Sequence, residues 1–106
     1  MQSLTMPENS PARAAFIMDG DYMAPWLRAG EVVAVEWALP EAGECGLFQR
    51  EGQTLVRQYC EDSFGNIYLF ALNRDFRQMD VVIPAGEAIL CLGRLLLQKT
   101  PPLPLD

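Results

Sequence analysis

The chain has 106 residues, enough for one domain around one hydrophobic core and too few for two. Half of the residues are hydrophobic and 21% are charged, a composition that excludes a disordered chain. With 8 Lys and Arg residues against 14 Asp and Glu residues, the net charge is −6, so direct nucleic-acid binding by this segment is not expected.

The first element along the chain is the segment Met1–Arg13, which is polar and lacks periodicity and is therefore predicted to be a flexible arm or the end of a linker. The predicted folded body is Ala14–Lys99. Within it, only Tyr22–Leu27 favours a helical turn, and Pro25 limits this turn in length. The last segment, Thr100–Asp106, contains three prolines and is predicted to be a tail that extends no strand.

Between these segments, turn residues recur about every ten residues and separate short stretches rich in Val, Ile, Leu, Phe and Tyr. These stretches predict a mainly β fold built from antiparallel strands. The predicted strands are Glu31–Trp37, Gly46–Arg50, Gln53–Cys60, Ile67–Leu72, Met79–Ile83 and Ala88–Leu97. Two hairpins are predicted, at Glu51-Gly52 and at Phe64–Asn66, because both turns contain residues that tolerate positive φ.

The three cysteines do not indicate a disulfide framework or a zinc site, because their number is odd and they are far apart in sequence. They are Cys45, Cys60 and Cys91, and buried thiols in a reducing cytosol are the preferred interpretation. Asp19 and Asp21 flank a glycine, and a turn with a capping hydrogen bond is favoured over a metal site. No metal or cofactor is predicted. The chain also lacks a stretch of roughly 20 apolar residues and a signal pattern, so we expect a cytoplasmic protein that is not inserted in a membrane.

One segment carries a family resemblance. Residues 18–36, MDGDYMAPWLRAGEVVAVE, resemble the pattern GDSMEPTL..GD.V.V of LexA-like and phage repressors, UmuD-type proteins and signal peptidases. The matching positions are Gly20, Asp21, Met23, Pro25, Leu27, Gly30, Val32 and Val35, and Glu31 stands where the family usually has Asp. Residues 40–59, 69–84 and 89–96 resemble later parts of the family pattern. The resemblance implies a twisted antiparallel β fold in which a serine attacks a peptide bond after a neutral buried lysine removes its proton.

Both of those catalytic residues are replaced in this chain, because Tyr22 stands at the serine position and Arg57 at the lysine position. A lysine acts as a base only when burial lowers its pKa, whereas a guanidinium stays protonated and cannot accept a proton. The chain has no histidine, and its one lysine, Lys99, adjoins the tail. Its serines, Ser3, Ser10 and Ser63, lie in the predicted arm and in a predicted turn. The sequence therefore predicts a pseudo-peptidase without a catalytic residue.

The favoured interpretation of Tyr22 and Arg57 is a stacked or hydrogen-bonded pair that fills a vestigial site. Two alternatives are a ligand or partner contact through the same surface and a nucleophilic Tyr22 activated by the cation. The C-terminal run 89–97 is apolar on both faces and would need cover on both sides, which predicts a homodimer. The dimer candidates are Leu92, Leu95 and Leu97.

Together these features predict a non-catalytic domain that mediates the dimerisation or regulation of a transcriptional repressor. It is expected either to be cut from a longer chain with an N-terminal helix-turn-helix DNA-binding domain or to occur alone in a prophage or mobile element. One alternative is a peptidase that remains active through an unrecognised nucleophile. Another is a decoy subunit that pairs with an active relative.

Overall fold

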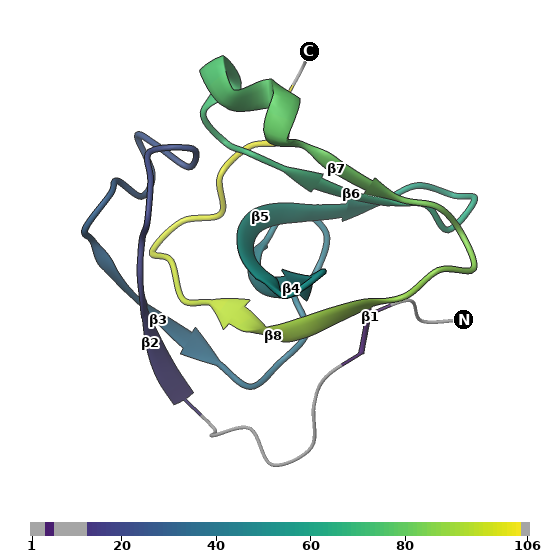
Figure 1. The fold of residues 1–106 in the computed structure, drawn as a ribbon, viewed down its shortest axis with the longest axis horizontal. Helices are drawn as coiled ribbons and strands as arrows, with labels where there is room; N and C mark the ends of the chain where they lie inside the picture. The colour runs from purple at the N-terminus through teal and green to yellow at the C-terminus, as the bar shows by residue number, and fades with distance from the viewer. Residues whose placement is uncertain (1–3, 6–12, 105–106) are drawn as a thin grey trace.

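The computed structural model describes residues 4–5 and 13–104, which form a mainly β structure (Figure 1). The strands are β1 (Leu4–Thr5), β2 (Arg13–Ile17), β3 (Val32–Glu36), β4 (Cys45–Arg50), β5 (Gln53–Glu61), β6 (Ile67–Phe70), β7 (Val81–Ile83) and β8 (Ile89–Leu95). One short 3-10 helix, η1 (Arg74–Met79), lies between β6 and β7. The predicted fold class, mainly β with antiparallel strands, is confirmed.

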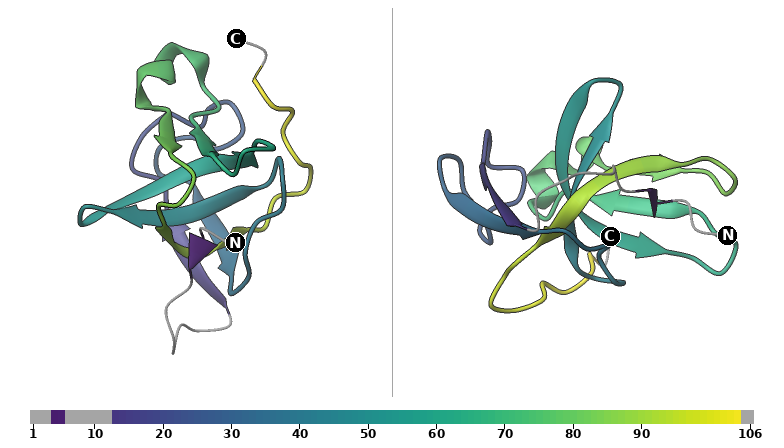
Figure 2. Two further views of the ribbon diagram at one scale, coloured as in Figure 1. Left: turned by 90° about the vertical axis from the view of Figure 1, so that its right-hand side faces the viewer. Right: turned by 90° about the horizontal axis from the view of Figure 1, so that it is seen from below.

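The strands form one strongly curved sheet in the order β2-β3-β8-β4-β5-β6-β7, and the short β1 pairs in parallel with β8. Figure 1 shows β4 and β5 in the middle, with β2 and β3 on one side and β6 and β7 on the other. Figure 2 shows the same arrangement from two further directions. The long strand β5 connects the two sides, because its residues 53–58 pair with β4 and its residues 58–61 pair with β6.

The hydrophobic core has two parts that follow this division of the sheet. One cluster contains Met18, Tyr22, Met23, Leu27, Val33, Val35, Cys45, Leu47, Val56, Ala71 and Leu95. The other contains Leu4, Phe48, Ile67, Leu69, Ile83, Ile89 and Cys91. Alternate residues of β8 face inward, as expected for a strand whose side chains point to opposite faces in turn. Strand β8 therefore contributes side chains to both clusters.

Close contact between β8 and β3 requires a glycine at position 93. A Cβ atom at Gly93 would lie 2.5 Å from Cγ1 of Val35 and 2.6 Å from the carbonyl oxygen of Glu36. Both distances are shorter than the approach of a Cβ atom to any non-bonded heavy atom in folded proteins. The pairing of β8 with β4 also shifts register between Leu47 and Phe48. Gly93 thus allows one strand to join β3 on one side and β4 on the other.

All six predicted strands have counterparts in the structure, with ends that differ by at most a few residues. Both predicted hairpins form, because β5 pairs with β4 across Glu51-Gly52 and with β6 across Phe64–Asn66. Positive φ angles occur at Glu51, Gly52 and Gly65, as the turns require. The sequence did not predict β2, nor β1 within the segment expected to be an arm. Leu4 is buried against β8, and residues 6–12 of that segment lie outside the described residues.

The helical turn does not lie where the sequence predicted it. Tyr22–Leu27 forms hydrogen-bonded turns and no helix, because Pro25 has no N–H for a helical hydrogen bond. The helix is η1, whose first turn is capped by Asn73 Oδ1, an acceptor for a backbone N–H. Arg74, the first residue of η1, forms an ion pair with Asp80, the residue that follows η1, and two hydrogen bonds join the two side chains. These side-chain contacts stabilise a turn that hydrophobic periodicity does not reveal.

The C-terminal segment packs on the sheet through one buried amide. Nε2 of Gln58 donates hydrogen bonds to the carbonyl oxygens of Gly43 (2.9 Å) and Pro101 (2.7 Å). Residues 100–104 contain no strand, yet Pro101 is buried. The helix in the described part of the chain is too short and too polar to cross a membrane.

Candidate functional site

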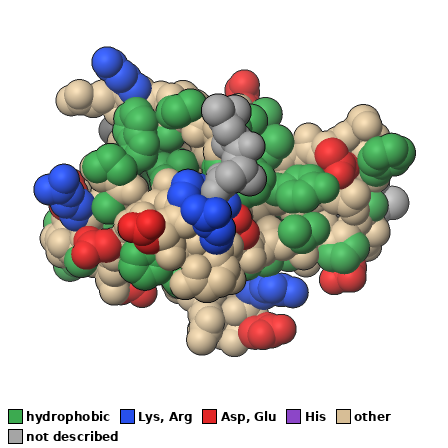
Figure 3. Space-filling model, turned by 90° about the horizontal axis from the view of Figure 1, so that it is seen from above, with side chains coloured by type: hydrophobic (Ala, Val, Ile, Leu, Met, Phe, Trp, Pro, Cys, Tyr) green, Lys and Arg blue, Asp and Glu red, His purple; other side chains and the backbone are tan. Residues whose placement is uncertain are grey.

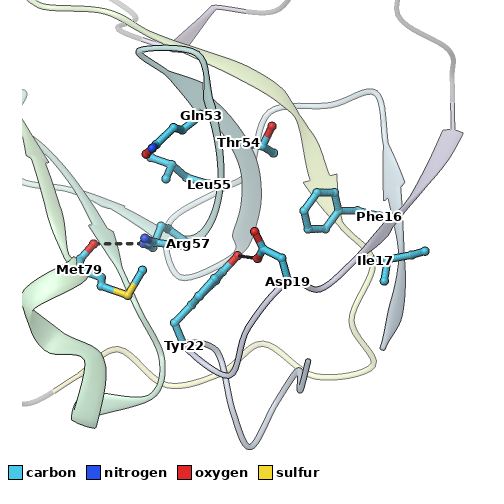
Figure 4. A pocket seen from close by; sticks show the side chains of 9 residues that line it. All are labelled: Phe16, Ile17, Asp19, Tyr22, Gln53, Thr54, Leu55, Arg57 and Met79. Atoms are coloured by element: carbon cyan, nitrogen blue, oxygen red, sulfur yellow. Dashed lines mark hydrogen bonds between the residues drawn. The ribbon is translucent and has the colours of Figure 1, made fainter. Parts of the chain in front are cut away.

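Tyr22 lies in the turn region that follows β2, with its side chain directed toward β5 (Figure 4). The side chain is buried, and its phenol donates a hydrogen bond of 2.7 Å to Oδ1 of Asp19. Its backbone carbonyl accepts a 2.9 Å hydrogen bond from the N–H of Asn73, the residue that caps η1. Tyr22 is therefore held both at its backbone and at the end of its side chain.

The second residue of the site is Arg57 on β5, which packs against the ring of Tyr22. Its guanidinium carbon lies 4.6 Å from the centre of the Tyr22 ring, within the range of a cation–π interaction. Its Nε donates to the carbonyl of Met79 (3.2 Å) and its Nη1 donates to the carbonyl of Val56 (2.8 Å). Although Arg57 is only 2% exposed, it forms no ion pair with a carboxylate in residues 4–5 or 13–104. The structure thus brings together the two positions that the sequence analysis singled out.

The protonation states of this pair follow from burial and from Asp19. Burial and the hydrogen bond to Asp19 raise the pKa of Tyr22 to about 12, despite the opposing charge of Arg57. Burial also lowers the pKa of Arg57 from its ordinary value, but a guanidinium starts so far above neutrality that it remains charged. At neutral pH the site therefore holds a neutral phenol and a cation.

This arrangement has no effective base. The Asp19 carboxylate accepts the phenol hydrogen bond, but a carboxylate is a far weaker base than a phenolate, so the proton stays on Tyr22. Arg57 has no lone pair that could accept a proton. The geometry consequently favours binding or packing over nucleophilic catalysis at this position.

An open pocket of about 560 Å³ lies beside the Tyr22–Arg57 contact (Figure 4). Its lining residues are Phe16, Ile17, Asp19, Tyr22, Gln53, Thr54, Leu55, Arg57 and Met79. Strand β2 supplies one wall and the first half of β5 supplies another. Among the described residues, this half of β5 pairs with β4 on one side and with no strand on the other. The pocket therefore lies along an unpaired edge of the sheet.

The five motif residues named for this site, Gly20, Asp21, Met23, Pro25 and Gly30, all belong to the loop that joins β2 to β3. Met23 is fully buried, and its sulfur accepts a hydrogen bond from the backbone N–H of Leu72 (3.4 Å). Gly30 has a φ of 86°, and its N–H donates to the carbonyl of Met18 (2.8 Å), which closes the loop. The motif residues shape the loop around Tyr22, while Pro25 is exposed.

The two aspartates of the motif have different partners. Oδ1 of Asp21 accepts a hydrogen bond from the backbone N–H of Ala29 (2.9 Å), which fits the predicted turn. Asp19 instead accepts from the Tyr22 phenol. No group of three potential metal ligands occurs in residues 4–5 and 13–104.

The other candidate nucleophiles named from the sequence do not form a second site in the described residues. Ser63 and Lys99 are exposed and no hydrogen bond joins them in residues 13–104, and Ser3 and Ser10 lie outside the described residues. Burial raises the pKa of Cys45 to about 12 and that of Cys91 to about 11, so both thiols stay protonated at neutral pH.

The three dimer candidates on and after β8 do not form one exposed surface. Leu95 is only 5% exposed and belongs to the core, so its selection as a contact residue was wrong. Leu92 and Leu97 are half-buried and pack against the same cluster. The reason is that β8 lies inside the sheet between β3 and β4, where the monomer itself covers much of its apolar surface.

Sequence reasoning missed two parts of the site. The partner of the Tyr22 phenol, Asp19, lies three residues earlier, a spacing that signals proximity in a turn but not this hydrogen bond. The carbonyl of Met79 is an acceptor for Arg57 from a segment 22 residues away, and no local pattern reveals such a contact.

No protein-family model matches the chain, and neither does any curated protein. The resemblance to LexA-like proteins therefore rests on residues 18–36 and the downstream segments that follow the same pattern.

Proposed function

We propose that this chain is a non-catalytic domain of the LexA and phage-repressor kind, which pairs the subunits of a cytoplasmic transcriptional regulator. The observation that carries the proposal is the contact between Tyr22 and Arg57. These are the positions at which the resemblance implies a serine and a lysine, and in a serine–lysine peptidase those two side chains must lie side by side. Their contact across 35 residues of sequence supports the match between the two patterns.

The chemistry of the pair supports the loss of catalysis. A peptidase of this kind needs a hydroxyl whose proton passes to a neutral amine. Here the raised pKa of Tyr22 keeps the proton on its hydroxyl, and Arg57 stays protonated and so cannot accept that proton.

Apolar residues that remain exposed on β2 and β3 support a role in subunit pairing. Ile17 and Val32 lie opposite each other in the two strands and are 64% and 66% exposed. Strand β2 is the first strand of the sheet, and a partner subunit that covered these two side chains at its edge would remove their apolar surface from water. We place the subunit contact on this face instead of on β8.

The charge of the chain supports the proposal that another domain, and not this one, contacts DNA. The net charge is −6, and on the face seen in Figure 3 the Lys and Arg side chains are separated from one another by acidic, polar and hydrophobic ones. A DNA-binding surface needs clustered cations to offset phosphate repulsion. In this proposal a distinct helix-turn-helix domain contacts the operator.

Two experiments test the proposal. The first is intact-mass analysis of the chain after long incubation at alkaline pH with an extended Ala-Gly peptide. No cleavage of either is expected, and cleavage that the Tyr22→Phe variant abolishes would overturn the non-catalytic assignment.

The second experiment is light scattering of the wild-type chain and two matched variants. The expected mass is that of two chains, and Val32→Asp should reduce it to one. Val82→Asp places the same charge at a 53% exposed valine on β7 and should leave the dimer intact. A wild-type chain that is monomeric at high concentration would contradict the pairing role.

A further inference from the structure

The pocket beside Tyr22 contains a buried cation, the guanidinium of Arg57. Arg57 lines this pocket, is 2% exposed and forms no ion pair within the described residues. Two of its N–H groups donate to backbone carbonyls and the guanidinium also interacts with the Tyr22 side chain, which leaves at least two of its five N–H groups as donors for a ligand. Charged side chains are rarely this buried unless they are paired, because removal from water is costly.

We propose that this pocket binds a small monocarboxylate with an apolar body, whose carboxylate pairs with Arg57. The planar guanidinium matches a carboxylate well, because two parallel hydrogen bonds join the two groups. The Tyr22 ring covers one face of the guanidinium, so the ligand approaches along its edge. The proposal does not depend on whether the chain belongs to a repressor, although Ile17 lies both in the pocket wall and on the face to which the subunit contact is assigned.

The surrounding charges favour a single negative charge on the ligand. Asp19 lines the pocket, and the negative charges of Asp19 and Asp80 both interact electrostatically with Arg57. The Asp80 carboxylate is already bound by Arg74 and by the backbone N–H of Ala71. A doubly charged phosphate would be repelled by Asp19 and by the net charge of −6.

The walls of the pocket favour an apolar ligand body. Phe16 and Ile17 from β2, and Leu55 from β5, contribute hydrocarbon surface to the pocket, whose lining also includes the polar Asp19, Gln53 and Thr54. A volume of about 560 Å³ lies in the range of small-molecule sites, and apolar walls with a few placed polar groups are typical of such sites.

The test is an NMR titration of the 106-residue chain with hexanoate, hexanamide and acetate, followed through backbone amide shifts. Hexanoate should bind saturably and shift the amides of Phe16, Leu55 and Arg57. Hexanamide, which lacks the charge, and acetate, which lacks the apolar body, should each bind at least about tenfold more weakly. Failure of hexanoate to saturate these shifts at up to about 10 mM, or equal binding of hexanamide, would overturn the proposal.

Two exposed aspartates provide a matched pair of variants that leave Arg57 in place. Asp19→Asn keeps an oxygen for the Tyr22 phenol and removes the negative charge in the pocket, so hexanoate should bind about threefold more tightly. Asp21→Asn removes the same charge two residues away, outside the pocket, and should leave the affinity unchanged. Equal effects of the two variants, or no effect of Asp19→Asn, would show that the carboxylate does not bind at Arg57.

Arg57→Gln should abolish the preference for hexanoate over hexanamide if the variant remains folded. Retention of that preference in a folded Arg57→Gln protein would also overturn the proposal. If this variant unfolds, the aspartate pair decides.

Discussion

Truncation of Tyr22 to alanine should destabilise the domain far more than removal of its hydroxyl alone. The ring is 6% exposed and packs in the core cluster, and loss of a buried aromatic ring costs about 3–5 kcal/mol. Loss of the cation–π contact with Arg57 adds about 0.5–2 kcal/mol. Tyr22→Phe keeps the ring and loses the hydrogen bond to Asp19, which costs about 1 kcal/mol.

Urea unfolding followed by circular dichroism measures these differences directly. The free energy of unfolding should fall by about 3.5–7 kcal/mol in Tyr22→Ala and by about 1 kcal/mol in Tyr22→Phe. At roughly 4–8 °C of Tm per kcal/mol for a domain of this size, the Tm of the alanine variant should lie at least about 14 °C below that of the wild-type chain. A cost below about 1 kcal/mol in Tyr22→Ala would refute the reasoning, because the ring could then not be packed over Arg57.

Four further predictions concern the rest of the fold. Gly93→Ala should lower the free energy of unfolding in urea by more than about 3 kcal/mol, because the new Cβ atom clashes with β3. Gly52→Ala is the control: Gly52 has a φ of 79° and open space around it, so this variant should lose only about 1 kcal/mol. Equal losses in the two variants would contradict the close contact between β8 and β3. Hydrogen bonds from the side-chain amide of Asn66, from the phenol of Tyr68 and from two backbone N–H groups lower the pKa of Asp62 from 3.8 to about 2. Its stabilising effect is therefore present above pH 3.8 and is lost as the pH falls toward 2, and Asp62→Ala should remove this part of the acid dependence of Tm. Since folding raises the pKa of Tyr22 from 10 to about 12, stability should decrease as the pH rises from 10 to 12, and less so in Tyr22→Phe. In the native state only Cys60 should react quickly with a thiol reagent, because the other two cysteines are buried; three fast thiols would contradict the core described here.

Much of the fold could be predicted because alternating hydrophobic residues and turn residues act locally. The hairpins at Glu51-Gly52 and Phe64–Asn66 follow from residues that tolerate positive φ. In contrast, β2 has the composition Arg-Ala-Ala-Phe-Ile, whose small residues give a weak strand signal. The short β1 is defined only by its pairing with a strand more than 80 residues later. Such non-local pairing is invisible to local patterns.

The candidate site, like the fold, could be predicted only in part. The positions of Tyr22 and Arg57 could be identified from sequence patterns, but their partners could not, because Asp19 and the Met79 carbonyl are selected by tertiary geometry. The burial of Leu95 was misjudged for a related reason. A run that is apolar on both faces does not reveal whether neighbouring strands or a second subunit covers it.

We propose that the phenol beside Arg57 keeps its proton and does not act as a nucleophile. A ¹³C NMR titration of the phenol carbon of Tyr22, assigned by the signal that Tyr22→Phe lacks, measures its ionisation. The expected pKa is about 12, with no ionisation below pH 10. A Tyr22 pKa below 10 would contradict it, because the charge of Arg57 would then outweigh burial and Asp19 and would create a phenolate able to attack.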